Sequence, residues 1–166
     1  NEQDYPYGDP RNPVHQMSSS SDAVQFVLDQ PMAREPGEAW AYNSGASILL
    51  GGILEEATGR NVLNFAREAL FAPIGMGLVR WDWMPGGHQA THGGLYLTSR
   101  DMARLGYLML RNGTWDGQEI VSADWVARST RTYYPVDGAH GYGYQWWLDK
   151  DGSYSAIGVG GQYIMI

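Results

Sequence analysis

The sequence contains no cysteine, and Lys150 is its only lysine among 166 residues. The absence of cysteine excludes disulfides, thiolate zinc sites and cysteine nucleophiles. It fits a cytoplasmic and a bacterial exported protein equally, so the compartment stays open. No apolar stretch approaches the roughly 20 residues that a membrane span needs. Basic residues are few, and the formal net charge of −7 argues against nucleic acid or an anionic membrane surface as a partner.

The most informative stretch is residues 36–59, which read PGEAWAYNSGASILLGGILEEATG. Here Tyr42 and Ser44 stand where a loop becomes an apolar helix, and we expect Ser44 to cap that helix and Gly59 to end it. The helix is apolar around most of its circumference, which predicts that it is buried. Two adjacent glycines at 51–52 indicate that another segment packs closely against its backbone. A helix start also offers free backbone N–H groups and partial positive charge to a developing anion.

The remaining pattern predicts an α+β chain. Further helix starts are expected in the run from Ser18 to Asp22, which offers several N-caps, and at Asn61, Thr98 and Ser122, whereas residues 73–94 are typical of a loop. From residue 141 onward three antiparallel strands are predicted, near 142–146, 154–157 and 163–166. We therefore expect a mainly helical lobe over 1–138 and the strands of a sheet lobe over 139–166. Because the last strand pattern runs up to residue 166, we expect a piece of a longer protein.

Four stretches together resemble the serine β-lactamase and penicillin-binding-protein superfamily. They are PG, YNSG, LG and TG within 36–59, GGL to RDMA at 93–103, GYGYQWW at 141–147 and GVGGQ at 158–162. They occur in the family's order and cover most of the chain from about Asp22 onward. The branch that they most resemble holds class C β-lactamases, related esterases and hydrolases of nylon-oligomer type. The resemblance implies the helical lobe and part of the antiparallel sheet of a two-lobed α+β fold, incomplete in this chain.

The resemblance also implies a serine hydrolase that forms an acyl-enzyme with an ester, amide or lactam. In that family a serine and a lysine one helical turn apart form the first motif, and Tyr42 matches the tyrosine that moves the proton between serine and leaving group. Trp147 stands three residues before Lys150, so this sequence has no Ser-x-x-Lys. The nucleophile is therefore expected outside these residues, and the chain alone is expected to be inactive.

Two positions depart from the family's pattern. The third motif reads Val159-Gly160-Gly161 without its usual basic residue, and Ser44 replaces the asparagine that many members have two residues after the tyrosine. Both departures favour an esterase or amidase over a β-lactamase. Gly160 and Gly161 are candidates for the oxyanion and substrate strand, since glycine lets a substrate approach the backbone. An equally good interpretation of residues 158–161 is a tight bend between strands. Ser44 is expected to position the substrate.

His88 and His92 have the i, i+4 spacing of a metal pair, but glycine pairs on both sides argue against the helix that such a pair requires. We therefore expect no metal site, and His92 is expected to line the substrate cleft. No metal or organic cofactor is implied. The expected partners are a small acyl substrate and the missing N- and C-terminal segments of the same protein, with no nucleic acid.

Two other functions stay open. One is a catalytically silent homologue that acts as a ligand-binding or sensor module, and an upstream Ser-x-x-Lys would argue against it. The other is a sugar-binding interaction domain that uses some of the seven tryptophans. The tryptophans in question are Trp81, Trp83, Trp146 and Trp147.

Overall fold

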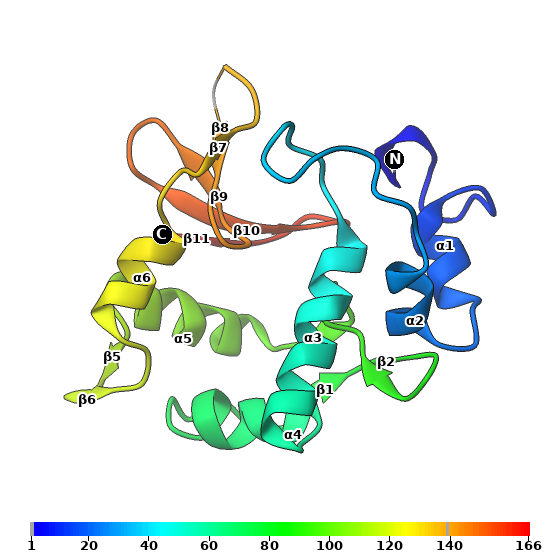
Figure 1. Cartoon of the computed structure of the whole chain (residues 1–166). Helices are drawn as coiled ribbons and strands as arrows, with labels where there is room; N and C mark the ends of the chain where they lie inside the picture. Colours follow the sequence, from blue (N-terminus) through cyan, green and yellow to red (C-terminus); the bar gives the residue numbers. More distant parts are fainter. Residues whose placement is uncertain (1, 139) are drawn as a thin grey trace. The chain divides into compact units, whose positions relative to one another are not determined.

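The computed structural model describes residues 2–138 and 140–166 and divides the chain into two compact units. The first unit comprises Asn1–Ala66 and Val79–Tyr96, and the second comprises Arg67–Leu78 and Leu97–Ile166. Figure 1 labels their helices and strands. Mixed helices and antiparallel strands confirm the predicted α+β class. The lobe boundary predicted after residue 138 falls inside the second unit and stays a prediction.

Short helices and one long helix make up most of the first unit. They are η1 (Glu2–Asp4), α1 (Pro13–Ser18), α2 (Ala23–Leu28), α3 (Ser44–Thr58) and α4 (Val62–Ala66). The predicted start at Asn61 is confirmed, and among the candidate caps from Ser18 to Asp22 it is Asp22 that caps α2. Each of the two side chains accepts the N–H of the third residue of its helix. Helix α1, with Asn12 as its N-cap and proline at its first position, was not expected from the sequence.

Helix α3 has the predicted length but a different cap. Gly59 ends it in the left-handed conformation, as expected, whereas the N-cap is Asn43, whose side chain accepts the N–H of Ala46. The prediction of Ser44 as the cap was therefore wrong, and Ser44 is the first helical residue. The close approach predicted at residues 51–52 is confirmed, since a Cβ on Gly51 would lie 2.6 Å from Thr91 Oγ1.

Residues 73–94, predicted as a loop, contain short strands. Strand β1 (Arg80–Trp81) pairs with β4 (Leu95–Tyr96), and β2 (Trp83–Met84) pairs with β3 (His88–Gln89), both antiparallel. Two-residue strands leave too little alternation for a period-2 signal to appear in the sequence. The core of this unit joins these strands to the helices through buried apolar side chains. They are Met17, Ala23, Ile48, Met84 and Ala90.

The second unit contains three helical segments. They are the π-helical turn η2 (Arg67–Phe71), α5 (Ser99–Leu110) and α6 (Ala123–Ser129). The predicted caps Thr98 and Ser122 are confirmed, and at Thr98 the side-chain oxygen accepts the N–H of Asp101 while its hydroxyl donates to the Asp101 carboxylate, in place of the backbone bond that a full capping box has. The hairpin of β5 (Thr114–Trp115) and β6 (Gln118–Glu119) turns at 116–117, where both residues have positive φ.

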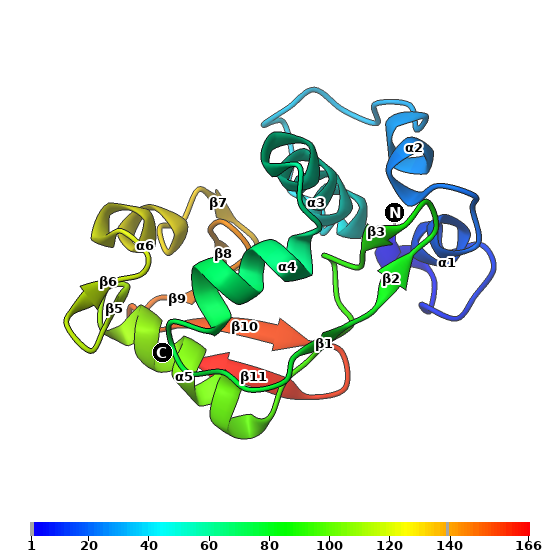
Figure 2. The same ribbon diagram turned by 90° about the horizontal axis from the view of Figure 1, so that it is seen from below.

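A five-stranded antiparallel sheet completes the second unit, in the order β11-β10-β9-β8-β7. The strands are β7 (Tyr134–Pro135), β8 (His140–Tyr142), β9 (Trp147–Asp149), β10 (Tyr154–Gly158) and β11 (Gln162–Met165). The last two predicted strands are confirmed as β10 and β11. The first was wrong, because the chain turns at Gln145, where φ is +71°, and forms β8 and β9 instead. Figure 2 shows β10 and β11 beside α5.

Exposed aromatic rings form a stack in the second unit. The rings of Tyr133 and Tyr144 lie parallel with centroids 4.6 Å apart, and Trp125 lies 5.6 Å from Tyr144. Arg128 and Arg131 lie over the rings of Trp125 and Tyr133, respectively. The stack therefore ties α6 to the loops on either side of β7 and β8 through ring faces.

None of the helices within the described residues has both the length and the apolar character that crossing a bilayer requires.

His140 in β8 lies between two carboxylates. Its Nδ1 is 3.0 Å from Asp137 Oδ2, and its Nε2 is 3.3 Å from Asp149 Oδ1. The hydrogen bond to Asp137, with the charges of both carboxylates, raises the pKa of His140 above its usual 6.5.

This pair of contacts makes the stability of the protein pH-dependent. Because the folded-state pKa is the higher one, the stabilisation is complete below pH 6.5 and is lost as the pH rises through the raised pKa. We expect the unfolding temperature to fall over that interval, and His140→Gln to remove this fall. Identical pH profiles of the two proteins in thermal melts would contradict the assignment.

Candidate functional site

Tyr42 lies in the extended segment directly before α3, and its ring is half-buried. The ring of Trp40 lies 6.4 Å away at a tilt of 57°. The helix that follows is 15 residues long, and its first turn carries the positive end of its dipole, where the N–H groups of Ser44 and Ala46 donate to the side chains of Glu2 and Asn43. The prediction that α3 is buried is confirmed only for one face. Ser44, Ile48 and Gly51 are buried along that face, whereas Leu50 and Ile53 are exposed on the other side of the helix.

Ser44 is buried and bonds to a carboxylate far away in the sequence. Its backbone N–H donates to Glu2 Oε2 at 2.6 Å, and its Oγ–H donates to Glu2 Oε1 at 2.9 Å, across 42 residues. Tyr7 also donates to Glu2 Oε1, at 3.3 Å. Glu2 is only 7% exposed, so these neutral donors compensate much of the cost of burying the carboxylate.

The backbone of Glu2 is fixed as well. Its carbonyl accepts a hydrogen bond from Asn12 Nδ2 at 2.9 Å, and the same amide donates to the Tyr5 carbonyl at 2.8 Å. Asn12 is fully buried and also caps α1. The segment that carries Glu2 is therefore tied to α1 on one side and to the start of α3 on the other.

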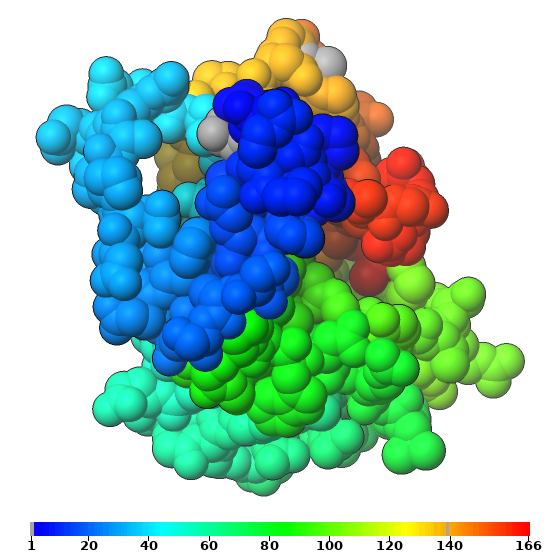
Figure 3. Space-filling view, turned by 90° about the vertical axis from the view of Figure 1, so that its right-hand side faces the viewer, coloured from blue at the N-terminus to red at the C-terminus, as the bar shows by residue number. Residues whose placement is uncertain are grey.

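A hollow of about 390 Å³ with mostly apolar walls lies in the first unit beside Glu2 and Asn43. Its walls come from α1, α2, residues 30–34 and the first turns of α3. Figure 3 shows the N-terminal segment (dark blue) next to the lighter-blue segment that follows α2. Glu2 thus lines this hollow while its carboxylate is bonded to Ser44 and Tyr7.

The phenol of Tyr42 is held in its protonated form. Burial raises the pKa of Tyr42, and the charge of Glu2 raises it further. Burial and the same carboxylate also raise the pKa of Tyr7. In this environment neither phenol is a base at neutral pH, and a nearby cation would be needed to make one.

His92 follows β3 and also lies within the electrostatic influence of Glu2. Burial lowers the pKa of His92, and the charge of Glu2 opposes that change only partly. Its Nδ1 is buried and has no hydrogen-bond partner among residues 2–138 and 140–166. The neighbouring Thr91 donates to the Ser47 carbonyl of α3 at 2.7 Å, which anchors this turn to the helix. Ser44 thus bonds directly to Glu2, and the charge of the same carboxylate acts on the pKa of both Tyr42 and His92.

Sequence reasoning missed this carboxylate. Glu2 stands in a polar segment without periodicity, and its partner Ser44 is 42 residues further on. No local pattern in the sequence carries such a signal, since hydrogen-bond pairing at this separation depends on the tertiary fold.

Gly160 and Gly161 belong to the second unit and form the turn between β10 and β11. Both have positive φ, and the N–H of Gly161 donates to the Gly158 carbonyl at 3.2 Å. A Cβ on Gly158 would overlap the side chain of Gln162. The interpretation of this run as a tight bend between strands is confirmed, and its role in an oxyanion site stays a prediction.

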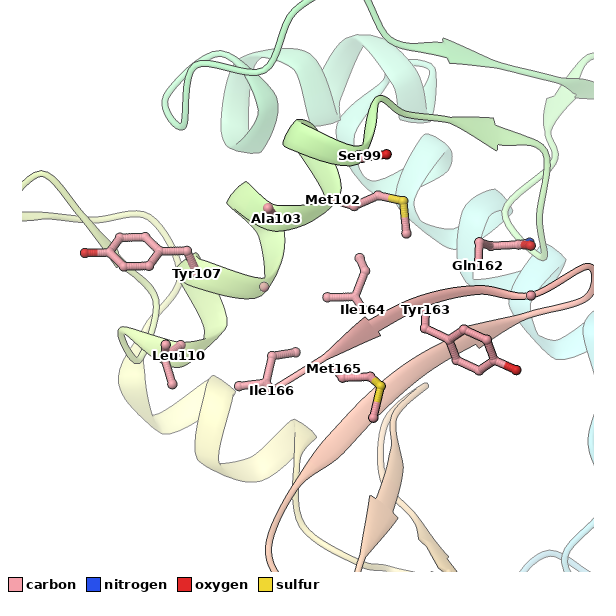
Figure 4. A pocket seen from close by; sticks show the side chains of 12 residues that line it. Ser99, Met102, Ala103, Tyr107, Leu110, Gln162, Tyr163, Ile164, Met165 and Ile166 are labelled. Atoms are coloured by element: carbon pink, nitrogen blue, oxygen red, sulfur yellow. The ribbon is translucent and has the colours of Figure 1, made fainter.

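A second hollow, of about 670 Å³, lies between α5 and β11 in the second unit. Figure 4 shows Ile164 and Ile166 directed toward the helix with Met102, whereas Tyr163 lies on the other side of the strand. A Cβ on Gly106 would lie 3.1 Å from Ile164, so this glycine permits the close approach. The lining is mostly apolar, with Gly161 and Gln162 at one end. This lining suits packing better than proton transfer.

The two spaced histidines have different surroundings. His88 lies in β3, not in a helix, and its Nδ1 is 3.0 Å from Glu55 Oε2 while its Nε2 is 3.6 Å from Asp22 Oδ1. Within the described part of the chain, no group of three His, Cys, Asp or Glu residues is arranged to hold a metal ion.

Three of the tryptophans considered for sugar binding make internal contacts. Trp81 Nε1 donates to the carbonyls of Ala90 and Gly93, both at 2.9 Å. Trp146 meets Tyr154, and Trp147 meets Tyr142, edge to face. These contacts give the three rings a packing role.

The beta-lactamase family model matches residues 3–166. The 6-aminohexanoate-dimer hydrolase of Paenarthrobacter ureafaciens is 29% identical over 161 residues, covering 88% of this chain and 40% of that protein. Penicillin-binding protein 4* of Bacillus subtilis is 29% identical over 68 residues, or 40% of this chain and 15% of that protein.

Solved structures share the fold. A Bacillus anthracis protein described as a 6-aminohexanoate-dimer hydrolase matches with a TM-score of 0.85 and 22% identity, over 100% of this chain and 48% of that one. A penicillin-binding protein of Bacillus halodurans matches with a TM-score of 0.69 and 20% identity, over 81% and 48%. The chain spans less than half the length of each of these four relatives. It belongs to the beta-lactamase family, within the serine β-lactamase and penicillin-binding-protein superfamily that its motifs predicted.

Proposed function

We propose that this chain is part of a serine hydrolase that acylates its nucleophile with an ester, amide or lactam and then hydrolyses the acyl-enzyme. Tyr42 is the general base and acid. The observation that carries the proposal is the half-buried Tyr42 ring at the start of α3, in a sequence that matches the beta-lactamase family over residues 3–166.

The serine and its lysine come from polypeptide outside the 166 residues, because the sequence contains no Ser-x-x-Lys. A serine hydroxyl is a poor nucleophile until a base removes its proton. Burial and Glu2 raise the pKa of Tyr42, so the phenol needs a neighbouring cation before it can take that proton. The lysine of the first motif supplies that charge. Tyr42 then returns the proton to the leaving group.

The other site residues have supporting roles. His92 faces the substrate, and its unpaired Nδ1 is the atom that supports this role. Ser44 positions the substrate indirectly, since its hydroxyl is engaged by Glu2. Gly160 and Gly161 contribute to the wall around the oxyanion. A linear amide is the favoured substrate class, given the absence of a basic residue in the third motif and the name of the Paenarthrobacter relative.

The second candidate is a catalytically silent homologue that binds ligands or acts as a sensor. In that case the surrounding polypeptide would lack the serine–lysine pair as well. The cluster around Glu2 would then serve ligand binding without turnover.

Comparing the full-length protein with the isolated 166 residues tests the proposal. We expect the full-length protein to hydrolyse p-nitrophenyl acetate or a linear amide with a burst of acyl-enzyme, and the isolated chain to hydrolyse neither that ester nor nitrocefin above background. Saturable turnover by the isolated chain would reveal a nucleophile within it. An inactive full-length protein that binds acyl ligands would support the silent homologue.

A further inference from the structure

We propose that Glu2 is a positioning residue of the acyl-transfer site, which fixes the first turn of α3 and thereby the place of the Tyr42 phenol. This inference rests on the proposed function of Tyr42. Glu2 acts through Ser44 and the start of α3.

The hydrogen bonds around Glu2 support this role. Its two oxygens accept the N–H and the Oγ–H of Ser44, at 2.6 and 2.9 Å, so one carboxylate holds both the backbone and the side chain of the first helical residue. Ser44 is two residues from Tyr42, with only the N-cap Asn43 between them. Hydrogen bonds to a charged acceptor are stronger than neutral ones and are favoured at a helix N-terminus.

The position of Glu2 is itself fixed by a hydrogen bond from Asn12 to its backbone. Asn12 is fully buried and donates to the backbone carbonyl of Glu2 at 2.9 Å. Its Oδ1 accepts the N–H of Val14 at 2.8 Å in the first turn of α1. Hydrogen bonds therefore connect the first turn of α1 to Asn12, Asn12 to Glu2, and Glu2 to Ser44, the first residue of α3.

The same carboxylate acts on the chemistry of the phenol. Within residues 2–138 and 140–166 the charge of Glu2 acts on the titratable groups of Tyr42, Tyr7 and His92, and it raises the pKa of both phenols. Glu2 thus favours the protonated phenol, which is the form that returns a proton to the leaving group. The cation that ionises Tyr42 must overcome this charge.

The full-length variant Glu2→Gln tests the inference. We expect single-turnover acylation by p-nitrophenyl acetate to slow by about 10-fold or more, because a neutral amide cannot accept both bonds from Ser44. We also expect the acidic limb of the pH–rate profile to move to lower pH, because the charge that opposes ionisation of Tyr42 is gone. The matched control is Glu56→Gln, which makes the same change at an exposed position of α3 and leaves both quantities unchanged.

A second variant keeps the test decisive if Glu2→Gln does not fold. Ser44→Ala removes one of the two bonds and keeps the charge, so we expect slower acylation with an unshifted pH profile. Wild-type acylation in Ser44→Ala, or wild-type rate and profile in a folded Glu2→Gln, would overturn the inference. Slower acylation by Glu2→Gln with an unmoved pH profile would assign Glu2 a structural role only and would also overturn it.

Failure of the inference differs from failure of the proposed function. If Tyr42→Phe acylates like the wild type, both the proposed role of Tyr42 and the role of Glu2 that depends on it are contradicted. If Tyr42→Phe is impaired while Glu2→Gln behaves like the wild type, the role of Glu2 alone falls.

Discussion

Replacing Tyr42 with phenylalanine in the full-length protein is expected to slow acylation by about 10²–10⁴-fold, the usual contribution of a general acid–base group. Phenylalanine keeps the half-buried ring and its contact with Trp40, so the fold should persist. Without the hydroxyl, neither the serine proton nor the leaving group has its transfer partner. The measurement is the burst rate of acyl-enzyme formation, with circular dichroism to verify folding.

Tyr107→Phe is the matched control for this experiment. Its ring is 50% exposed on α5 and packs edge to face on Trp115, so loss of its hydroxyl should leave acylation unchanged. An acylation rate for Tyr42→Phe within a few-fold of the control would remove Tyr42 from the mechanism.

Replacing Gly113 with alanine is expected to destabilise the protein by about 2–5 kcal/mol, the sum of a left-handed alanine and a steric overlap. Gly113 has φ of +81° just beyond α5, and a Cβ there would overlap the carbonyl oxygen of Val121. Its N–H donates to the Leu108 carbonyl at 2.8 Å, and its own carbonyl accepts from Ile120 and Val121. The backbone therefore cannot move aside without breaking the end of the helix.

Gly117 provides a matched control because it separates the two costs. Its φ is +80°, almost the same as that of Gly113, but a Cβ there would meet nothing within 4 Å. Gly117→Ala should therefore cost only the left-handed strain, about 1–2 kcal/mol. Chemical denaturation of both variants measures the difference. Equal losses in the two variants would contradict the steric overlap at Gly113.

Helices that carry their own start signals were predictable from the sequence. Asp22, Asn61, Thr98 and Ser122 each supply a capping oxygen next to an apolar pattern, so local chemistry fixes those boundaries. At α3 two adjacent residues, Asn43 and Ser44, could both cap. Asn43 is the cap, because the N–H and hydroxyl of Ser44 are bonded to Glu2. Those bonds are tertiary contacts, which no local sequence pattern indicates.

The candidate site was predictable in part for the same reason. Tyr42 was predicted from its place before an apolar helix and from the family resemblance, and His92 was expected to line the substrate cleft because the glycine pairs around it indicate a loop. Glu2 and Asn12 were missed because their roles depend on partners far away in the sequence or on segments without periodicity. The break at Gln145 was missed because a non-glycine residue with φ of +71° gives no turn signal.

The aromatic stack on α6 has a spectroscopic consequence. Tyr133 and Tyr144 lie parallel at 4.6 Å, with Trp125 close to Tyr144, so their ultraviolet transitions are coupled and chirally arranged. Near-ultraviolet dichroism of such rings depends on fixed tertiary packing and disappears when that packing loosens. Since all three residues belong to the second unit, the contribution of their rings to this signal reports on the packing of that unit.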